Sequence, residues 1–134
     1  GGGSELAGDT IRPGDELAFS YVNADAYPYL AVCAIDEHDH VYWYHPAWTS
    51  PEENPESISI RGGHEAYEIP AAISHELDGK TLRIVAAFTR GPVHVRDLER
   101  ELVGARRAGV PFARALSEAF GDVAVSERIL RVAP

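Results

Sequence analysis

The sequence has only one cysteine, Cys33, among its 134 residues. A single thiol cannot form an intrachain disulfide, and zinc clusters built on several thiolates are excluded as well. Cys33 lies in the apolar segment YLAVCAID, and burial raises the pKa of a thiol and lowers its reactivity. We therefore expect Cys33 to be a buried, unreactive side chain.

Long apolar runs are also missing. No segment approaches the roughly 20 apolar residues that a membrane-spanning helix requires. The start of the chain, GGGSELAGD, has neither the basic residues nor the apolar stretch of a signal peptide. Its glycines and polar residues are typical of a flexible linker, so we interpret residues 1–10 as a linker and residues 11–134 as one globular domain.

Basic residues are scarce in the first part of the chain. Residues 1–80 contain 15 acidic and 3 basic side chains, whereas residues 81–134 contain 6 acidic and 9 basic ones. An acidic body argues against nucleic-acid binding, which needs clustered Lys and Arg to neutralise phosphates. The arginines of the second part are spread at helical spacing. They belong either to a solvated helix face or to a surface that packs against the acidic part of this chain or of a partner.

Strand patterns dominate residues 14–90. In residues 17–22 large apolar side chains alternate with smaller ones, which predicts a strand with one face on a core. Residues 29–36 are apolar on both faces, as in a central strand, and residues 41–45 follow after a short polar turn, so the two predict a hairpin. Residues 81–89 predict another strand. The proline-rich segment 46–57 must be a loop, residues 58–60 and 65–69 are short strand candidates around Gly62 and Gly63, and residues 70–80 predict one turn of helix or an irregular crossing.

The pattern changes to helical after Gly91 and Pro92, and a helical part is predicted over 93–120. Leu98, Leu102 and Ala105 share one face of a first helix, and Gly109 suits its C-terminal cap. Pro111 suits the first turn of a second helix, in which apolar residues recur at i, i+3, i+4, i+7 and i+8. Residues 123–132 predict a final strand. The fold class is therefore α+β: an antiparallel β-sandwich with a C-terminal helical pair and a closing β-strand.

Candidate chemistry concentrates in DEHDHVYWYHPAW, residues 36–48. As a strand, Val41, Trp43 and His45 would share one face, and His40, Tyr42 and Tyr44 the other. Aromatic side chains at these positions are explained by packing between layers. The alternative is a metal site, in which His38, His40 and Asp36 around one turn, with His45, would hold zinc or iron. Otherwise His38 and His40 are solvated turn residues, and His45 hydrogen-bonds a backbone group.

No established catalytic motif is complete. HEAYE (64–68) and HELDG (75–79) begin like the zinc helix of metalloproteases, but neither has the second histidine. There is no Gly-x-Ser-x-Gly elbow, phosphate loop or dinucleotide motif. We therefore expect no catalytic residues, no metal and no cofactor.

The order of these segments resembles a known bacterial family. GDELAFSYVNADAYPYLAVCAIDEHDHVYWYHPAW, then HEAYEIPAAISHELDGKTLRIVAAFT, then GPVHVRDLE is similar to domain of unknown function 4384, over about residues 14–98. The version it resembles accompanies anti-sigma-factor-like zinc-finger modules, often after a membrane span. The resemblance implies a signalling accessory or sensor domain on the extracytoplasmic (periplasmic) side, without catalytic residues to transfer. The zinc-finger module itself is absent here.

The leading functional prediction is a non-enzymatic sensory or protein-interaction domain of a larger bacterial regulatory protein. The expected partner is a protein or a small ligand, not nucleic acid. A membrane would be reached only through flanking segments. The chain itself is expected to be a monomer or a homodimer. The expected contact surface comprises Tyr42, Tyr44, His45, Trp48 and Pro51, with Trp48 alternatively a loop anchor in the core. Two other functions stay open: a small metal-dependent hydrolase using His38, His40 and His45, and a structural module that self-associates.

Overall fold

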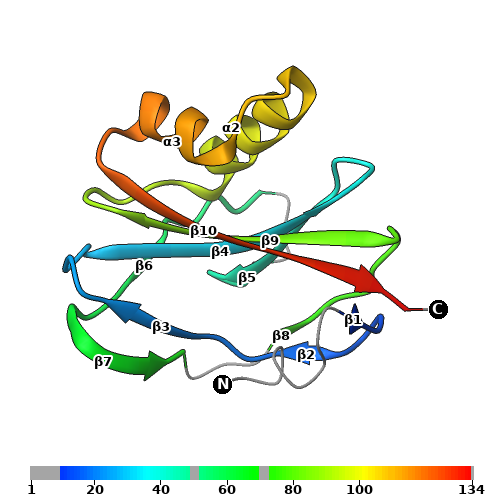
Figure 1. Cartoon of the computed structure of the whole chain (residues 1–134), viewed down its shortest axis with the longest axis horizontal. Helices are drawn as coiled ribbons and strands as arrows, with labels where there is room; N and C mark the ends of the chain where they lie inside the picture. The colour runs from blue at the N-terminus through cyan, green and yellow to red at the C-terminus, as the bar shows by residue number, and fades with distance from the viewer. Residues whose placement is uncertain (1–9, 49–51, 70–72, 134) are drawn as a thin grey trace.

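The computed structural model describes residues 10–48, 52–69 and 73–133 (Figure 1). Its centre is a six-stranded sheet in which β1, β10, β9, β4 and β5 follow one another and β6 also pairs with β4. Two short two-stranded ribbons, β2 with β8 and β3 with β7, form a separate layer. The strand bounds are β1 Thr10–Ile11, β2 Glu16–Leu17, β3 Ser20–Asn23, β4 Tyr29–Asp36, β5 Val41–His45, β6 Ile58–Ser59, β7 Gly63–Glu68, β8 Ile73–Ser74, β9 Thr81–Thr89 and β10 Val123–Val132.

Strands β4 and β9 lie side by side in the middle of the main sheet, and both of their faces are covered. In Figure 1 the helices lie above the main sheet and the two ribbons lie below it. Side chains of β4 alternate between the two layers: Cys33 and Ile35 join a core cluster under the helices, whereas Val32 and Ala34 join one over the ribbons. The nearly continuous apolar sequence of β4 thus reflects burial on both sides, as the sequence predicted. Cys33 is fully buried, also as predicted.

The ribbon layer corrects two details of the sequence prediction. The single strand expected over 17–22 is split, since β2 ends at Leu17 and β3 begins at Ser20, and the two pieces pair with different partners. Residues 70–72 lie outside the described residues, but residues 73–74 form β8 rather than a turn of helix. Strand β2 pairs with β8 and strand β3 pairs with β7, each in a short antiparallel ladder. Long-range pairing of this kind overrides local sequence patterns.

Helices α2 (Val95–Ala108) and α3 (Phe112–Phe120) confirm the predicted helical pair. Leu98, Leu102 and Ala105 are buried against the sheet, as their spacing predicted. Gly109 ends α2 with a φ of 72°, a left-handed conformation that glycine adopts without steric cost. The start of α2 is capped from a distance, because the Asn54 side chain accepts the Arg96 backbone N–H (3.1 Å). Helix α2 is therefore tied to the loop after β5.

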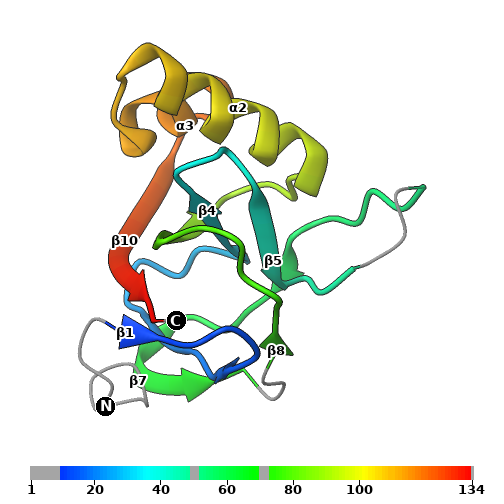
Figure 2. The same cartoon turned by 90° about the vertical axis from the view of Figure 1, so that its right-hand side faces the viewer.

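Strand β10 closes the fold, as predicted for residues 123–132. It pairs antiparallel with the whole length of β9, from Val123 opposite Thr89 to Arg131 opposite Thr81. Parallel pairing with β1 is confined to Arg131 and Val132, so the sheet is antiparallel except at this end. Figure 2 shows β10 and β5 toward opposite edges of the sheet, with β4 between them. The fold is the predicted α+β arrangement of a β-sandwich, a C-terminal helical pair and a closing strand.

Candidate functional site

Strand β5 contributes side chains to both core clusters, the one under the helices and the one over the ribbons. Trp43 faces the helices, where its indole Nε1 donates to the Glu99 carboxylate (2.6 Å). Tyr44 faces the ribbons, where its ring meets Phe19 edge-on (centroids 5.3 Å apart) and His75 (5.0 Å). Burial raises the Tyr44 pKa to about 12, so the phenol is neutral. Packing between two layers therefore accounts for the two central aromatic side chains of this strand.

A β-bulge changes the side on which His45 lies. Cys33 pairs with Trp43 and the preceding Val32 pairs with His45, so Tyr44 is an extra residue on β5. His45 therefore shares the ribbon side with Tyr44, and its ring lies perpendicular to that of Phe19 (5.6 Å). The predicted face shared by Trp43 and His45 is wrong, because strict alternation does not survive a bulge. Burial lowers the His45 pKa, and the ring is buried with Nε2 unpaired among the described residues.

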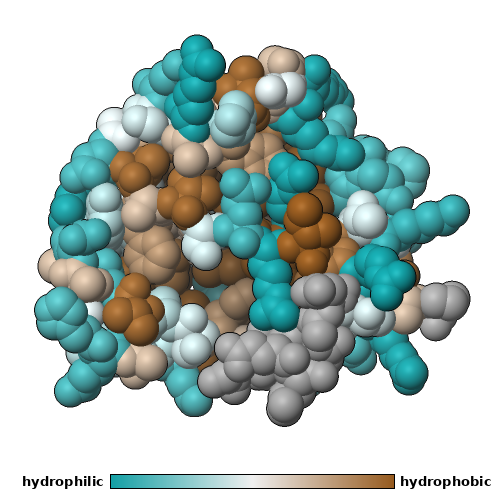
Figure 3. Space-filling view, viewed as in Figure 1, coloured by the Kyte–Doolittle hydropathy of each residue, from teal (hydrophilic) through white to brown (hydrophobic). Residues whose placement is uncertain are grey.

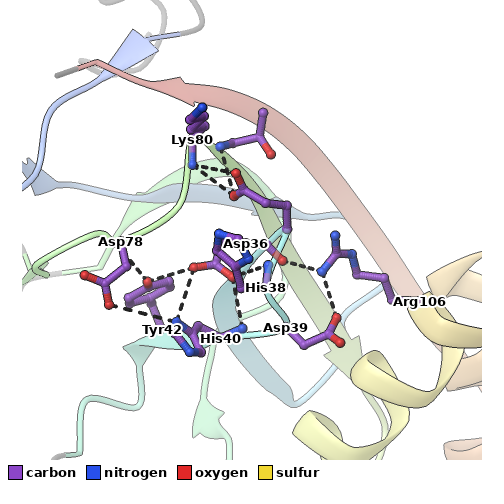
Figure 4. A network of polar contacts seen from close by, with 10 residues as sticks. Asp36, His38, Asp39, His40, Tyr42, Asp78, Lys80 and Arg106 are labelled. Atoms are coloured by element: carbon purple, nitrogen blue, oxygen red, sulfur yellow. Dashed lines mark hydrogen bonds and ion pairs between the residues drawn. The ribbon is translucent and has the colours of Figure 1, made fainter.

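The turn between β4 and β5 is organised by Asp36 (Figure 4). One carboxylate oxygen, Oδ1, accepts the backbone N–H groups of His38 (2.8 Å) and His40 (3.0 Å). The other, Oδ2, accepts the Tyr42 hydroxyl (2.9 Å), which itself accepts the Asp78 backbone N–H (3.2 Å). Asp36 is only 2% exposed, so these donors replace the water that a buried carboxylate loses.

The two other acidic residues of the turn bind neighbouring elements. Glu37 accepts the backbone N–H groups of Lys80 (2.8 and 2.9 Å) and Thr81 (3.3 Å) at the start of β9. These donors lower the Glu37 pKa from 4.5 to about 2. Asp39 pairs with Arg106 (2.7 Å) and Arg107 (3.1 Å) of α2, and both arginines lower its pKa. Here the basic C-terminal part does pack against the acidic body, one of the two alternatives that the sequence left open.

The histidines proposed as metal ligands are not brought together as a set. His38 and His40 are exposed, with ring centroids 6.3 Å apart, as expected of turn residues. The His40 Nδ1 lies 3.6 Å from Asp36 Oδ2 and 3.9 Å from Asp78 Oδ2. His45 lies at the far end of β5, about 16 Å along the strand from the turn. Over residues 10–48, 52–69 and 73–133, no three His, Cys, Asp or Glu side chains group as a metal site would require.

The predicted contact residues fall into three groups. Tyr44 and His45 are buried, so in this fold they cannot reach a partner. Tyr42 and Trp48 are half-buried, and Trp48 packs against the core under the helices with Arg96 near its ring (5.9 Å). Pro51 lies outside the described residues. Among the described members, Tyr42 and Trp48 remain accessible, and the packing of Trp48 favours its role as a loop anchor.

Two features of the site were not foreseen from the sequence. His75, from the HELDG segment, contributes its ring Nε2 to a 2.6 Å hydrogen bond with the Trp43 carbonyl, which makes it a structural donor. A groove of about 640 Å³ lies beside β1 and the end of β10, where Leu77 and Val132 provide apolar surface and Lys80 and Arg131 provide charge.

Comparison with known proteins adds no assignment. No protein-family model, curated protein or solved structure matches this chain. In the described part of the chain, neither helix has the length and apolar character needed to cross a membrane.

Proposed function

We propose that this chain is a non-enzymatic sensory or protein-interaction domain of a larger bacterial regulatory protein of the anti-sigma type. One observation carries the non-enzymatic part: both oxygens of Asp36 are occupied by donors from its own hairpin. A catalytic or metal-binding carboxylate needs an oxygen directed at its ligand. The link to a regulatory parent and to the extracytoplasmic side rests on the sequence resemblance.

Other side chains that could take part in catalysis are likewise occupied in structural contacts. Glu37 and Asp39 are directed at backbone N–H groups and at arginines, and His75 is bonded to a carbonyl. Cys33 is fully buried, and burial raises its pKa. Each of these groups contributes to holding two layers or two elements together, which supports a scaffold that presents a surface.

The contact surface that we propose is the loop around Trp48, because Tyr42 packs against the opposite core cluster and its hydroxyl is bound to Asp36 and Asp78. Half-buried aromatic side chains are enriched at interfaces because each offers a large ring and one polar atom. The indole Nε1 of Trp48 is buried and has no hydrogen-bond partner among the described residues.

Elemental analysis of protein purified without an affinity tag tests this proposal against the hydrolase. Absence of stoichiometric metal is the expected result. Stoichiometric zinc or iron that disappears in a His38→Ala/His40→Ala double variant would overturn the proposal in favour of the hydrolase.

The contact surface is tested by photo-crosslinking in cells that contain the full-length parent protein. A photoreactive residue at the exposed Ala47, beside Trp48, should give one discrete adduct, whereas the same residue at Arg100 on α2 should not. Loss of that adduct in Trp48→Ala, with the melting temperature preserved, supports a contact. Adducts of equal yield from both positions would contradict the proposed surface.

A further inference from the structure

Among the described residues, the outer edge of β10 is unpaired over most of its length. On one side, β10 pairs with β9 from Val123 to Arg131. On the other side, β1 covers only Arg131 and Val132, and no strand of the described residues pairs with β10 between Val123 and Leu130. Figure 1 looks onto this edge, with β10 in front of β9, and Figure 3 shows hydrophobic side chains among polar ones on the same side. Long open edges are templates for pairing with another strand.

Two hydrogen bonds show which backbone groups face outward. Val132 donates its N–H to the Lys80 carbonyl on the β9 side (2.8 Å), whereas Ala133 donates to the Ile11 carbonyl on the β1 side (2.7 Å). In a regular antiparallel ladder the direction alternates from residue to residue, and the β9–β10 register has no shift. The odd-numbered residues therefore present both N–H and C=O to the open edge: Val123, Val125, Glu127 and Ile129.

We propose that this edge binds the same edge of a second copy of the chain, antiparallel, about a two-fold axis at Ser126. In that register Val123 lies opposite Ile129 of the partner subunit, and Val125 lies opposite the partner's Glu127. Each of these narrow pairs exchanges two hydrogen bonds, so the symmetric interface contains about eight. All four outward-facing residues of both strands are paired. The result is a self-complementary interface, which a two-fold dimer requires.

Side chains agree with this register. Ile129 is 55% exposed in the single chain and is covered by the partner's Val123. Glu127 faces an apolar residue, and its charge is compensated by Arg83 of its own chain (3.7 Å). On the other face, two small Ser126 side chains meet at the axis. Moving the axis to Glu127 or to Arg128 places like charges directly opposite each other, which destabilises a strand pair.

Cysteine crosslinking tests both the dimer and its register. At the axis, Ser126 faces Ser126 of the partner subunit in a wide pair, where Cα atoms are about 4.5 Å apart and a disulfide can form. Ser126→Cys should therefore give a covalent dimer under mild oxidation. The control is Arg128→Cys, on the same face. In this register the Cα atoms of residue 128 in the two subunits are about 13 Å apart along the strands, so this variant should not crosslink. Cys33 does not interfere because it is fully buried.

Light scattering provides a second, independent measurement. The unmodified chain should show the mass of a dimer, and Val125→Pro, which removes an outward N–H, should show that of a monomer with its melting temperature largely kept. As a control, Val22→Thr alters the other 55% exposed large apolar residue, on β3, and should remain dimeric. A monomeric native chain over the full concentration series, or equal crosslinking of Ser126→Cys and Arg128→Cys, overturns the proposal. The dimer does not depend on the regulatory function proposed above.

Discussion

Replacing Asp36 with alanine should destabilise the fold strongly. The substitution removes the acceptor of two backbone N–H groups and of the Tyr42 hydroxyl. Hydrogen bonds to charged groups contribute about 1.5–3 kcal/mol each, and the two N–H groups lie in an exposed turn where water can replace part of the loss. We therefore expect a decrease of about 3 kcal/mol in the free energy of unfolding, or about 10 °C in melting temperature for a chain of this size.

Two milder variants separate the contributions. Tyr42→Phe removes one of the three hydrogen bonds to Asp36 and the acceptor of the exposed Asp78 N–H, which water can replace, and should cost about 1 kcal/mol. Asp36→Asn keeps an oxygen for the two N–H groups and turns its amide toward Tyr42, whose hydroxyl can accept, so its cost should also be about 1 kcal/mol. In the double variant Asp36→Ala/Tyr42→Phe the two effects should not add, because both substitutions remove the same contact.

Urea unfolding followed by tryptophan fluorescence and circular dichroism measures these differences. A carboxylate retained for catalysis or metal binding commonly lowers stability, so its removal raises the melting temperature. An unchanged or increased stability in Asp36→Ala would therefore refute the structural role of Asp36. Full additivity of Asp36→Ala and Tyr42→Phe would refute the specific contact between them.

Three further predictions concern the same hairpin and its surroundings. Because the folded-state Glu37 pKa is lowered to about 2 from 4.5, its contribution to stability should be present above pH 4.5 and lost as the pH falls toward 2; Glu37→Gln should flatten the acid limb of a melting-temperature series. Gly79→Ala would bring a Cβ to 2.7 Å from Asp36 Cβ and should cost about 1–3 kcal/mol in urea unfolding, whereas Gly104→Ala, in open space on α2, should gain about 0.5–1 kcal/mol; equal effects would contradict the packing. Cys33 should react with a thiol reagent only at the rate of unfolding, and rapid labelling of the native chain would show that it is accessible.

Segments with a strong period were predicted well from the sequence. The long strands at residues 29–36, 81–89 and 123–132 and both helices appear where the pattern placed them. In residues 29–36, 81–89 and the first helix the burial follows from the spacing of apolar residues, so that no tertiary information was needed, whereas in residues 123–132 only Leu130 is buried. Short segments were predicted less well, because two residues such as Ile73 and Ser74 carry no period of their own.

The candidate site divides in the same way. The sequence shows three acidic and two histidine side chains in the turn of this hairpin, next to an aromatic strand. This composition was compatible with either a metal site or a structural turn. What Glu37 and Asp39 bind was decided by partners more than 40 residues away, namely Lys80 for Glu37 and Arg106 for Asp39. No local pattern encodes such pairs.

By itself, therefore, the amino-acid order determined which segments are strands and helices, which of their faces are apolar, and that the fold combines a sandwich with a helical pair. Tertiary structure alone decided the bulge at Tyr44 that turns His45 to the ribbon side, the partners of Glu37 and Asp39, and the edge of β10 that the described strands leave unpaired. Each of these depends on how strands and helices are placed against one another, and that placement is set by the packing of the complete fold rather than by the residues of one segment.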